Sequence, residues 1–259
     1  MGIESLDIEG LAERLDDAAR HATATAQVSA EAELALPDAY RVQRASIARR
    51  VARGERRTGI KMGFTSRAKM VQMGIDTVIW GLLTSAMVVE EGGSIALSGY
   101  VHPRVEPEVA FLLKRPLAGP VTLLEAAAAL EAVAPAMEII DSRYARFKFS
   151  LGDVVADNSS SSGYCVGAWC APDVDVSNLG LVMSFDGQPV QIGSTAAILG
   201  HPLRSLAAAS ALAGAAGEEL AAGSIVLAGG ATSAEALRAG MHVRLEMQRL
   251  GSVSFRVGG

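Results

Sequence analysis

Two glutamates stand two residues apart in the run RVEPEVAFLL, where Glu106 and Glu108 flank a proline. Side chains at this spacing on a strand project from the same face, so the two carboxylates would lie side by side. Two carboxylates facing an apolar core repel each other and are costly to desolvate unless a cation or protons neutralise them. The spacing is also typical of an exposed edge strand. Pro107, which donates no ladder hydrogen bond, indicates an edge or irregular position.

A third carboxylate, Glu138, stands alone in the apolar run APAMEII. Three carboxylates without a histidine or cysteine ligand suit a hard cation such as Mg²⁺ or Mn²⁺, with coordination positions left for substrate oxygens. We therefore predict a divalent-metal site formed by Glu106, Glu108 and Glu138.

Lys61 lies in the apolar, glycine-rich segment TGIKMGFTS. Such surroundings would partly desolvate its ammonium group, and a buried lysine readily changes its pKa. One interpretation is a lysine whose long stem carries the charge to the surface. The other is a cation placed near the carboxylate of a substrate.

Two polar loops are further candidates for ligand binding. The run VVADNSSSSGY, residues 154–164, ends an apolar stretch in hydrogen-bonding residues, and it is either a flexible turn or a loop whose serines bind a carboxylate. The segment 229–232, Gly-Gly-Ala-Thr, predicts a turn, with the alternative that it lines the site.

Apolar residues recur at helical spacing over residues 8–20 and 38–53, and residues 23–37 connect these two predicted helices. Pro37 gives the second helix a start signal and Gly54 a stop signal. This helix is rich in arginine, which could attract an anionic substrate but is more typical of a solvated helix face.

Beyond Gly59 the sequence changes to short β-rich runs separated by glycine and proline. Asp186-Gly187 predicts a tight hairpin, and helices are expected at residues 122–133 and 203–215. The expected fold class is α+β, with a mixed, mostly antiparallel β body. We place a helical N-terminal part at residues 1–58 and a β-rich metal-binding catalytic domain at residues 59–259.

Composition narrows the possible partners. The chain has 259 residues and a formal net charge of −5, which gives no reason to expect nucleic-acid or anionic-membrane binding and favours a small molecule. The start lacks the pattern of a signal peptide, and Cys165 and Cys170 are expected to be reduced core thiols. We expect a cytoplasmic protein.

Several segments together resemble a known family. GIKMGFTSRAKMVQMGI, HPRVEPEVAFLL, MEIIDSRYARFKF, VVADNSSSSGY and GHPLRSL are similar, in this order, to the 2-oxopent-4-enoate hydratase and 4-oxalocrotonate decarboxylase family of aromatic meta-cleavage pathways. The resemblance implies a fold of the fumarylacetoacetate hydrolase type. It also implies Mg²⁺ or Mn²⁺ as cofactor, which would chelate the 1-carboxylate and 2-oxo group of the substrate.

The resemblance assigns roles to individual positions. The metal ligands of the family match the three glutamates already singled out, its active-site lysine matches Lys61, and a substrate-contacting serine matches Ser160. Hydratases of the family carry an acidic residue in a D-x-P-D-like run, where this chain has residues 76–81, DTVIWG. Ile79 replaces the acid, which counts against hydration because water must be activated.

The decarboxylase branch is therefore favoured, also because His102 and the stretch KMGFTSRAKM resemble that branch. Its reaction converts 2-oxohex-3-enedioate (4-oxalocrotonate) to 2-hydroxypenta-2,4-dienoate and carbon dioxide. We expect Ile79 and Trp80 to form an apolar wall that keeps water from the product. The alternatives are a 2-oxopent-4-enoate hydratase, a carbon–carbon bond hydrolase, and a non-catalytic subunit of a hydratase complex. We also expect the protein to form a homo-oligomer and to associate with a 2-oxopent-4-enoate hydratase.

Overall fold

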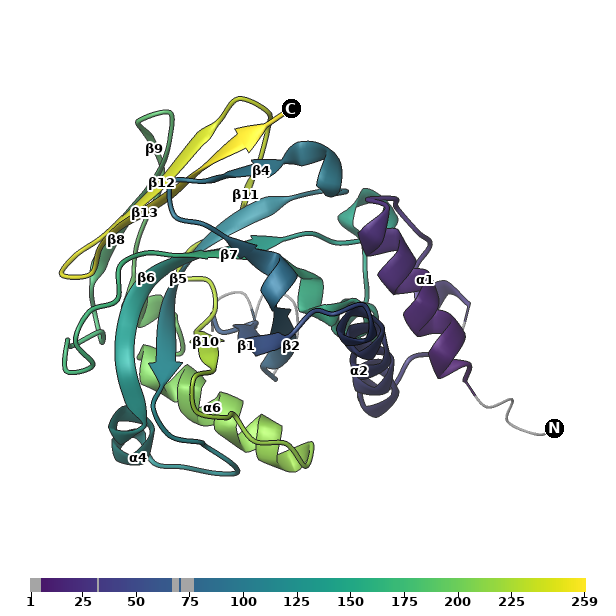
Figure 1. The fold of residues 1–259 in the computed structure, drawn as a ribbon, viewed down its shortest axis with the longest axis horizontal. Coiled ribbons are helices and arrows are strands. Elements are labelled where there is room, and N and C mark those ends of the chain that lie inside the picture. The colour runs from purple at the N-terminus through teal and green to yellow at the C-terminus, as the bar shows by residue number, and fades with distance from the viewer. Residues whose placement is uncertain (1–5, 32, 67–69, 71–76) are drawn as a thin grey trace.

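The computed structural model describes residues 6–31, 33–66, 70 and 77–259 of the chain. Two β-sheets form the body, and the N-terminal helices pack on one side of it (Figure 1). The larger sheet has the order β2-β1-β10-β5-β6-β7-β3, and β11 extends β5. Its strands are β1 (Arg57–Gly63), β2 (Ile79–Thr84), β3 (Val88–Val89), β5 (Arg104–Leu113), β6 (Leu130–Ile140), β7 (Ser161–Val166), β10 (Ile225–Leu227) and β11 (Glu235–Ala236).

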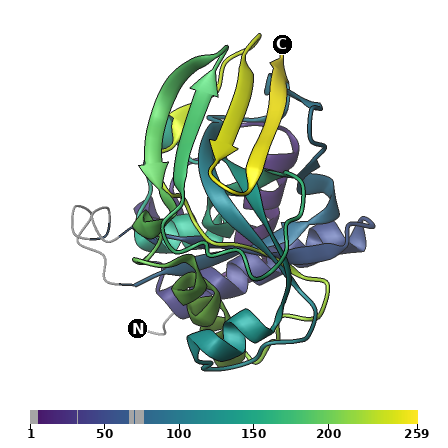
Figure 2. The same cartoon turned by 90° about the vertical axis from the view of Figure 1, so that its left-hand side faces the viewer.

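The smaller sheet has the order β4-β13-β12-β8-β9 and stands upright toward the viewer in Figure 2. Its strands are β4 (Ser94–Ala96), β8 (Gly180–Phe185), β9 (Gln188–Ser194), β12 (His242–Met247) and β13 (Gly251–Gly258). Asp186 and Gly187 join β8 to β9 with positive φ angles, as the hairpin prediction requires. Most described strand pairs are antiparallel, with β1–β10, β3–β7 and β4–β13 parallel, which confirms the predicted mixed β body.

The helices are mostly short. The α-helices are α1 (Ile8–Arg20), α2 (Leu36–Ala52), α4 (Leu123–Ala128), α5 (Leu151–Ala156) and α6 (Pro202–Ala215). The 3₁₀ turns are η1 (Val28–Ala30), η2 (Ser85–Met87), η3 (Leu97–Gly99), η4 (Ala145–Phe147), η5 (Asn158–Ser160) and η6 (Thr195–Ala197). Among the described residues no helix combines the length and apolar character needed to cross a membrane.

One predicted helix is too long. Residues 122–133 begin as a helix, because Thr122 and Glu125 form a capping box, but α4 ends at Ala128. From Leu130 the chain is strand β6, which pairs with β5 along its whole length. The alanine-rich run has helical propensity, but burial between two strands overrides that preference.

The larger sheet curls strongly, so strands far apart in its order meet. β7 and β1 are separated by three strands, yet Tyr164 donates a hydrogen bond to Thr58 across the interior at 2.8 Å. The amide side chain of Asn158 bonds both the N–H and the C=O of Leu82 in β2, at 2.8 and 2.9 Å. These bonds hold the two ends of the curled sheet together and leave an enclosed concave face.

The N-terminal helices share a second core with the β body. α1 packs against α2, and α2 packs against α5, so that Leu15, Val42, Tyr144 and Val155 are buried in one apolar cluster. Gln43 of α2 donates to the backbone carbonyls of Trp80 and Val155, both at 3.0 Å. The division into residues 1–58 and 59–259 therefore stays a prediction, because the two parts share this core.

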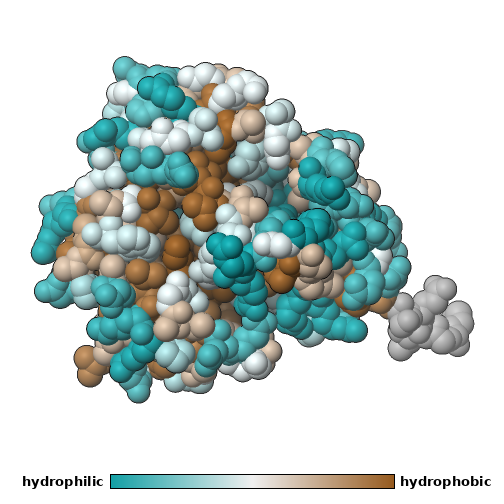
Figure 3. Space-filling view, viewed as in Figure 1, coloured by the Kyte–Doolittle hydropathy of each residue, from teal (hydrophilic) through white to brown (hydrophobic). Residues whose placement is uncertain are grey.

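Hydrophilic residues cover the outer surface of these helices, whereas apolar surface gathers over the sheets (Figure 3). The arginine-rich face of α2 is nevertheless only partly solvated. Arg53 binds both oxygens of Asp16 at 2.6 and 2.7 Å, and Arg49 adds a contact at 3.2 Å. Asp16, 1% exposed, thus ties α1 to α2.

Replacing Asp16 with Asn should destabilise the protein by about 1–3 kcal/mol at neutral pH, because charge-assisted hydrogen bonds to two guanidinium groups are lost. Burial alone would raise the pKa of Asp16, but Arg53, Arg49 and Arg50 lower it below 3.8. Its stabilising contribution is therefore complete above about pH 4 and is lost as the pH falls through the folded-state pKa.

Urea unfolding of the wild type and Asp16→Asn from pH 7 downward measures this difference. Asp17→Asn is the matched control, since Asp17 is half exposed and lies 4.0 Å from Arg49. An equal loss of stability in both variants would contradict the assignment to Asp16.

Candidate metal centre and active site

The concave face of the curled sheet brings the three predicted glutamates together. Glu106 lies directly opposite Glu138 in the register of β5 and β6, and Glu108 follows on the same face of β5. One carboxylate oxygen from each lies within 4.8 Å of the others. Glu108 and Glu138 are fully buried, whereas Glu106 is partly open to a cleft. The same-face prediction is therefore correct.

Pro107 does not lie on an outer edge strand, because β6 pairs with β5 along this whole stretch. On its other side β5 pairs with β10 and β11 at separate places, and the chain between those two strands loops away. The carbonyl of Pro107 accepts a bond from Ala231 in that loop. The missing N–H faces this interruption, so the irregular position is correct and the edge is not.

The same loop, residues 229–232, lines the site. The N–H of Gly229 donates to Glu108 at 2.7 Å, and Gly229 has φ of 100°. A Cβ atom on Gly230 would lie 2.7 Å from a carboxylate oxygen of Glu106, so any other residue there would displace that carboxylate from its present position. The sequence favours a turn for residues 229–232, and the structure shows that this turn also contacts the carboxylate cluster. Adjacent glycines after a buried strand were the available signal for close backbone approach.

Lys61 of β1 reaches the carboxylates from across the curl. Its Nζ lies 2.9 Å from Glu138, and its side chain is 4% exposed, so it does not extend to the surface. Burial alone would lower the pKa of Lys61, but the carboxylates of Glu138, Glu108 and Glu106 outweigh it and raise the pKa. The ammonium group is therefore held in its charged form.

One ammonium group does not neutralise three carboxylates. Burial, and then the neighbouring charge of Glu138, raises the pKa of Glu108 well above its usual range. Glu108 Oε1 has no hydrogen-bond partner among the described residues. A buried carboxylate with an unused oxygen, beside two others, fits a hard divalent cation, because the ion would supply the missing charge and occupy that oxygen.

A cleft of about 720 Å³ opens onto this cluster. Its polar lining includes Lys61, Glu106 and Ser160, and its apolar lining includes Ile79 and Phe149. The predicted apolar wall is thus half right. Trp80, the next residue on β2, points to the opposite face and stacks on Tyr40 of α2 at 5.6 Å. Successive strand residues face opposite sides, which excludes Trp80 from the cleft.

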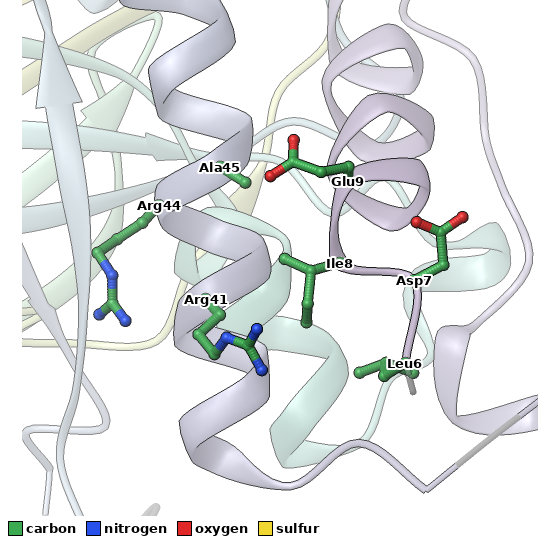
Figure 4. A pocket seen from close by; sticks show the side chains of 7 residues that line it. All are labelled: Leu6, Asp7, Ile8, Glu9, Arg41, Arg44 and Ala45. Carbon is green, nitrogen blue, oxygen red and sulfur yellow. The ribbon is translucent and has the colours of Figure 1, made fainter. Parts of the chain in front are cut away.

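A second depression lies at the N-terminal edge, between the first turn of α1 and α2 (Figure 4). Arg44 points away from α1 in this view, and Arg41 binds Asp38 on its own helix at 2.9 Å. Asp7 caps α1 by accepting from Gly10. Arg41 and Asp7 thus have local structural partners, and none of the predicted site residues lines this depression.

Several residues around the cleft were not predicted individually. Arg104, Phe147 and Lys148 line it, and Arg104 lies 4.8 Å over the ring of Phe147. Arg143 and Asp157 form a buried ion pair beneath it. The segment RYARFKF, residues 143–149, contains three of these residues, but no spacing rule indicates which of its charges turn inward. Both cysteines are free, as predicted, and Cys165 is buried.

The family profile described as "Fumarylacetoacetate (FAA) hydrolase C-terminal" matches residues 60–258, which form most of the chain. The chain belongs to the fumarylacetoacetate hydrolase family. The match covers the strands of both sheets, except for the first three residues of β1, and all residues of the carboxylate cluster. The predicted fold type is thereby confirmed.

Individual relatives place the chain more closely within the fumarylacetoacetate hydrolase family. A 4-oxalocrotonate decarboxylase of Pseudomonas sp is 60% identical over 254 residues, covering 98% of this chain and 99% of the relative. A 2-hydroxyhexa-2,4-dienoate hydratase of Comamonas testosteroni is 33% identical, covering 96% and 97%. These matches confirm the resemblance to the hydratase and decarboxylase group.

A solved structure agrees. The 4-oxalocrotonate decarboxylase from Pseudomonas putida G7, complexed with magnesium and adipate, matches with a TM-score of 0.95 at 39% identity and covers 99% of both chains. The two chains share the fold along their whole length.

Glu108→Gln should leave the metal-free protein at least as stable as the wild type, because burial and the charge of Glu138 disfavour a charged carboxylate here and raise the pKa of Glu108. The wild type should gain about 5–10 °C in Tm at Mg²⁺ concentrations near a hundred times Kd, whereas the variant should gain much less. Thermal unfolding in EDTA and in rising MgCl₂ measures both effects. Glu131→Gln, at an exposed position near the start of the same β6 strand that carries Glu138, is the control. A full Mg²⁺ response in Glu108→Gln would refute the site.

Proposed function

We propose that the protein is a metal-dependent decarboxylase that converts 2-oxohex-3-enedioate to 2-hydroxypenta-2,4-dienoate and carbon dioxide. The observation that carries the proposal is the buried cluster of three glutamates and Lys61 at the end of a largely apolar cleft. The relative at 60% identity, itself named 4-oxalocrotonate decarboxylase, supports the same reaction.

Glu106, Glu108 and Glu138 would hold the ion, with Mg²⁺ or Mn²⁺ as its identity, since an all-oxygen donor set suits a hard cation. The solved relative containing magnesium and adipate, a six-carbon dicarboxylate like the proposed substrate, supports this choice. When bound, the ion supplies Lewis-acid stabilisation of negative charge at the 2-oxo group. The glutamates thereby direct the substrate's 1-carboxylate and 2-oxo end toward the bottom of the cleft.

The reaction moves electrons along the substrate without requiring a base. As the C5–C6 bond breaks, its electron pair forms a C4–C5 double bond, the C3–C4 double bond shifts to C2–C3, and the charge reaches the 2-oxo oxygen. A proton on that oxygen completes 2-hydroxypenta-2,4-dienoate. Lys61, whose pKa is raised by its carboxylate neighbours, is charged and close to this end of the cleft, so it can stabilise that oxygen or protonate it.

The cleft favours decarboxylation over hydration. Among its lining residues that the structure describes, Glu106 is the only carboxylate, and it belongs to the metal cluster. Ile79 presents an aliphatic side chain where a hydratase needs a group that activates water. Asp76, at the start of the same run, lies outside the described residues. The greater identity to decarboxylases than to the Comamonas hydratase points the same way.

A non-catalytic subunit would be expected to have lost its metal ligands, whereas all three glutamates and Lys61 are present and gathered. The proposal also includes homo-oligomerisation and a complex with a hydratase that consumes the unstable dienol. Size-exclusion chromatography with light scattering, with and without that hydratase, tests this part. Separate elution at all concentrations would remove the complex from the proposal.

The decisive assay is incubation of purified protein and Mg²⁺ with 2-oxohex-3-enedioate. We expect carbon dioxide release together with the ultraviolet absorbance of the dienol, and loss of both in EDTA with recovery on adding Mg²⁺ or Mn²⁺. Conversion of 2-hydroxypenta-2,4-dienoate itself to a hydrated product, without carbon dioxide release from the dicarboxylate, would instead identify a hydratase.

Lys61→Met should lower kcat by about 10²–10⁴-fold, because the group that meets the developing charge is removed. Lys61→Arg, which keeps the charge at a different position, should recover part of the rate. Steady-state kinetics at saturating Mg²⁺ measure the effect, and the Mg²⁺-dependent rise in Tm shows that the glutamates remain intact. Unchanged kcat in Lys61→Met would rule out a catalytic role.

A further inference from the structure

The polar loop beside the cleft contains an uncommon backbone conformation. Asn158, Ser159 and Ser160 have φ angles of 50°, 52° and 59°, so three successive non-glycine residues adopt the left-handed region. Non-glycine residues visit this region singly and at an energetic cost. A left-handed turn of three such residues persists only where its surroundings hold it, and such conformations concentrate at functional sites.

A buried arginine holds the two flanks of the turn. Arg143 donates to Asp157 through its backbone N–H at 2.9 Å and its Nε at 2.5 Å, and to the carbonyl of Asp157 at 2.6 Å. Its remaining nitrogen donates to the hydroxyl of Ser162. The Arg143 and Asp157 side chains are each 2% exposed. One rigid guanidinium group thus bridges the residue before the turn and the second residue after it.

Strand β2 holds the turn from the other side. Besides the bonds from Asn158 to Leu82, the hydroxyl of Ser159 donates to the carbonyl of Trp80 at 2.7 Å. Gly81 lies between these contacts, and a Cβ atom there would come within 2.5 Å of the carbonyl oxygen of Asn158. The side chains of Asn158 and Ser159, the first two residues of the turn, therefore anchor the turn to β2.

The third residue is different. Ser160 is 5% exposed and lines the same cleft as Lys61 and Glu106, and its hydroxyl has no hydrogen-bond partner among the described residues. Its carbonyl is fixed by the N–H of Asp141 at 2.8 Å. A buried hydroxyl without a protein partner, on a backbone held from three directions, is suited to bind a ligand oxygen.

We propose that Arg143 is a positioning residue, which acts through the left-handed turn to aim the Ser160 hydroxyl at a carboxylate oxygen of the bound 2-oxo acid. Arg143 itself does not line the cleft. The inference rests on the proposed function for the identity of the ligand. It predicts that the effect of Arg143 on substrate binding and turnover depends on the presence of the Ser160 hydroxyl.

A double-mutant cycle tests this dependence. Ser160→Ala should lower kcat/KM about 10- to 100-fold, since one hydrogen bond to a charged oxygen is lost. Arg143→Lys keeps the positive charge but loses the several hydrogen-bond donors of the guanidinium group. It should lower kcat/KM about tenfold when Ser160 is present and less than twofold in the Ser160→Ala background. The dissociation constant of adipate, measured by calorimetry in saturating Mg²⁺, should follow the same non-additive pattern. The Mg²⁺-dependent rise in Tm should be equal in all four proteins.

Arg53→Lys is the matched control, because Arg53 also binds an aspartate through two nitrogens but far from the cleft lining. Arg53→Lys should change kcat/KM little, and by the same factor in the wild-type and Ser160→Ala backgrounds. If Arg143→Lys does not fold, Ser162→Ala replaces it, since it removes one contact of the Arg143 guanidinium group and Ser162 does not line the cleft. Additive losses in either cycle would overturn the positioning role, leaving the reaction assignment intact. Absence of turnover in the wild type would instead refute the proposed function.

Discussion

Three carboxylates and one ammonium group share the interior of the curled sheet, and this excess of negative charge constrains the structure around them. Glu108 and Glu138 are fully buried, and Lys61 can offset only one charge. A buried, unpaired carboxylate is costly, so it must take up a proton or meet a cation. The cluster is therefore stable either protonated or occupied by a divalent ion, and this choice couples its chemistry to its folding energy.

The architecture around the cluster serves to bring distant strands within reach of one another. Lys61 on β1 meets Glu138 on β6 only because the sheet curls, and the curl is closed by Asn158 bonding to β2. The N-terminal helices support this closure from outside, since Gln43 bonds the backbone of both β2 and α5. The N-terminal helices thus help to hold β2 in the position that closes the curled sheet around the site.

Much of the site could be predicted because its signals are local. The spacing of Glu106 and Glu108 implied a shared face, and a lone acid in an apolar run marked Glu138. The ion pair between Arg143 and Asp157 could not be predicted, because the two residues lie fourteen positions apart with a helix between them, and either side chain could have been solvated.

The errors have the same origin in tertiary context. The sequence predicts Trp80 in the wall of the cleft, but Trp80 alternates with Ile79 across the strand. It also predicts that the helix beginning at residue 122 continues to residue 133, but residues 130–133 belong to a strand that pairs with β5. Trp80 and Ile79 lie on opposite faces of β2, and both faces of this strand are buried. Where both faces of an element are buried, hydropathy cannot distinguish them.

The direct pairing of Glu106 with Glu138 has a consequence for assembly of the sheet. A shift of β6 by one residue would place Met137 or Ile139 opposite Glu106 and turn Glu138 to the other face. Such a misaligned sheet could still bury apolar side chains, because both faces of β6 are largely apolar, but it would bind no cation. Several alignments of β6 on β5 would bury similar amounts of apolar surface, but only the native one binds the ion. Cation binding would thus stabilise the native strand register relative to the shifted ones.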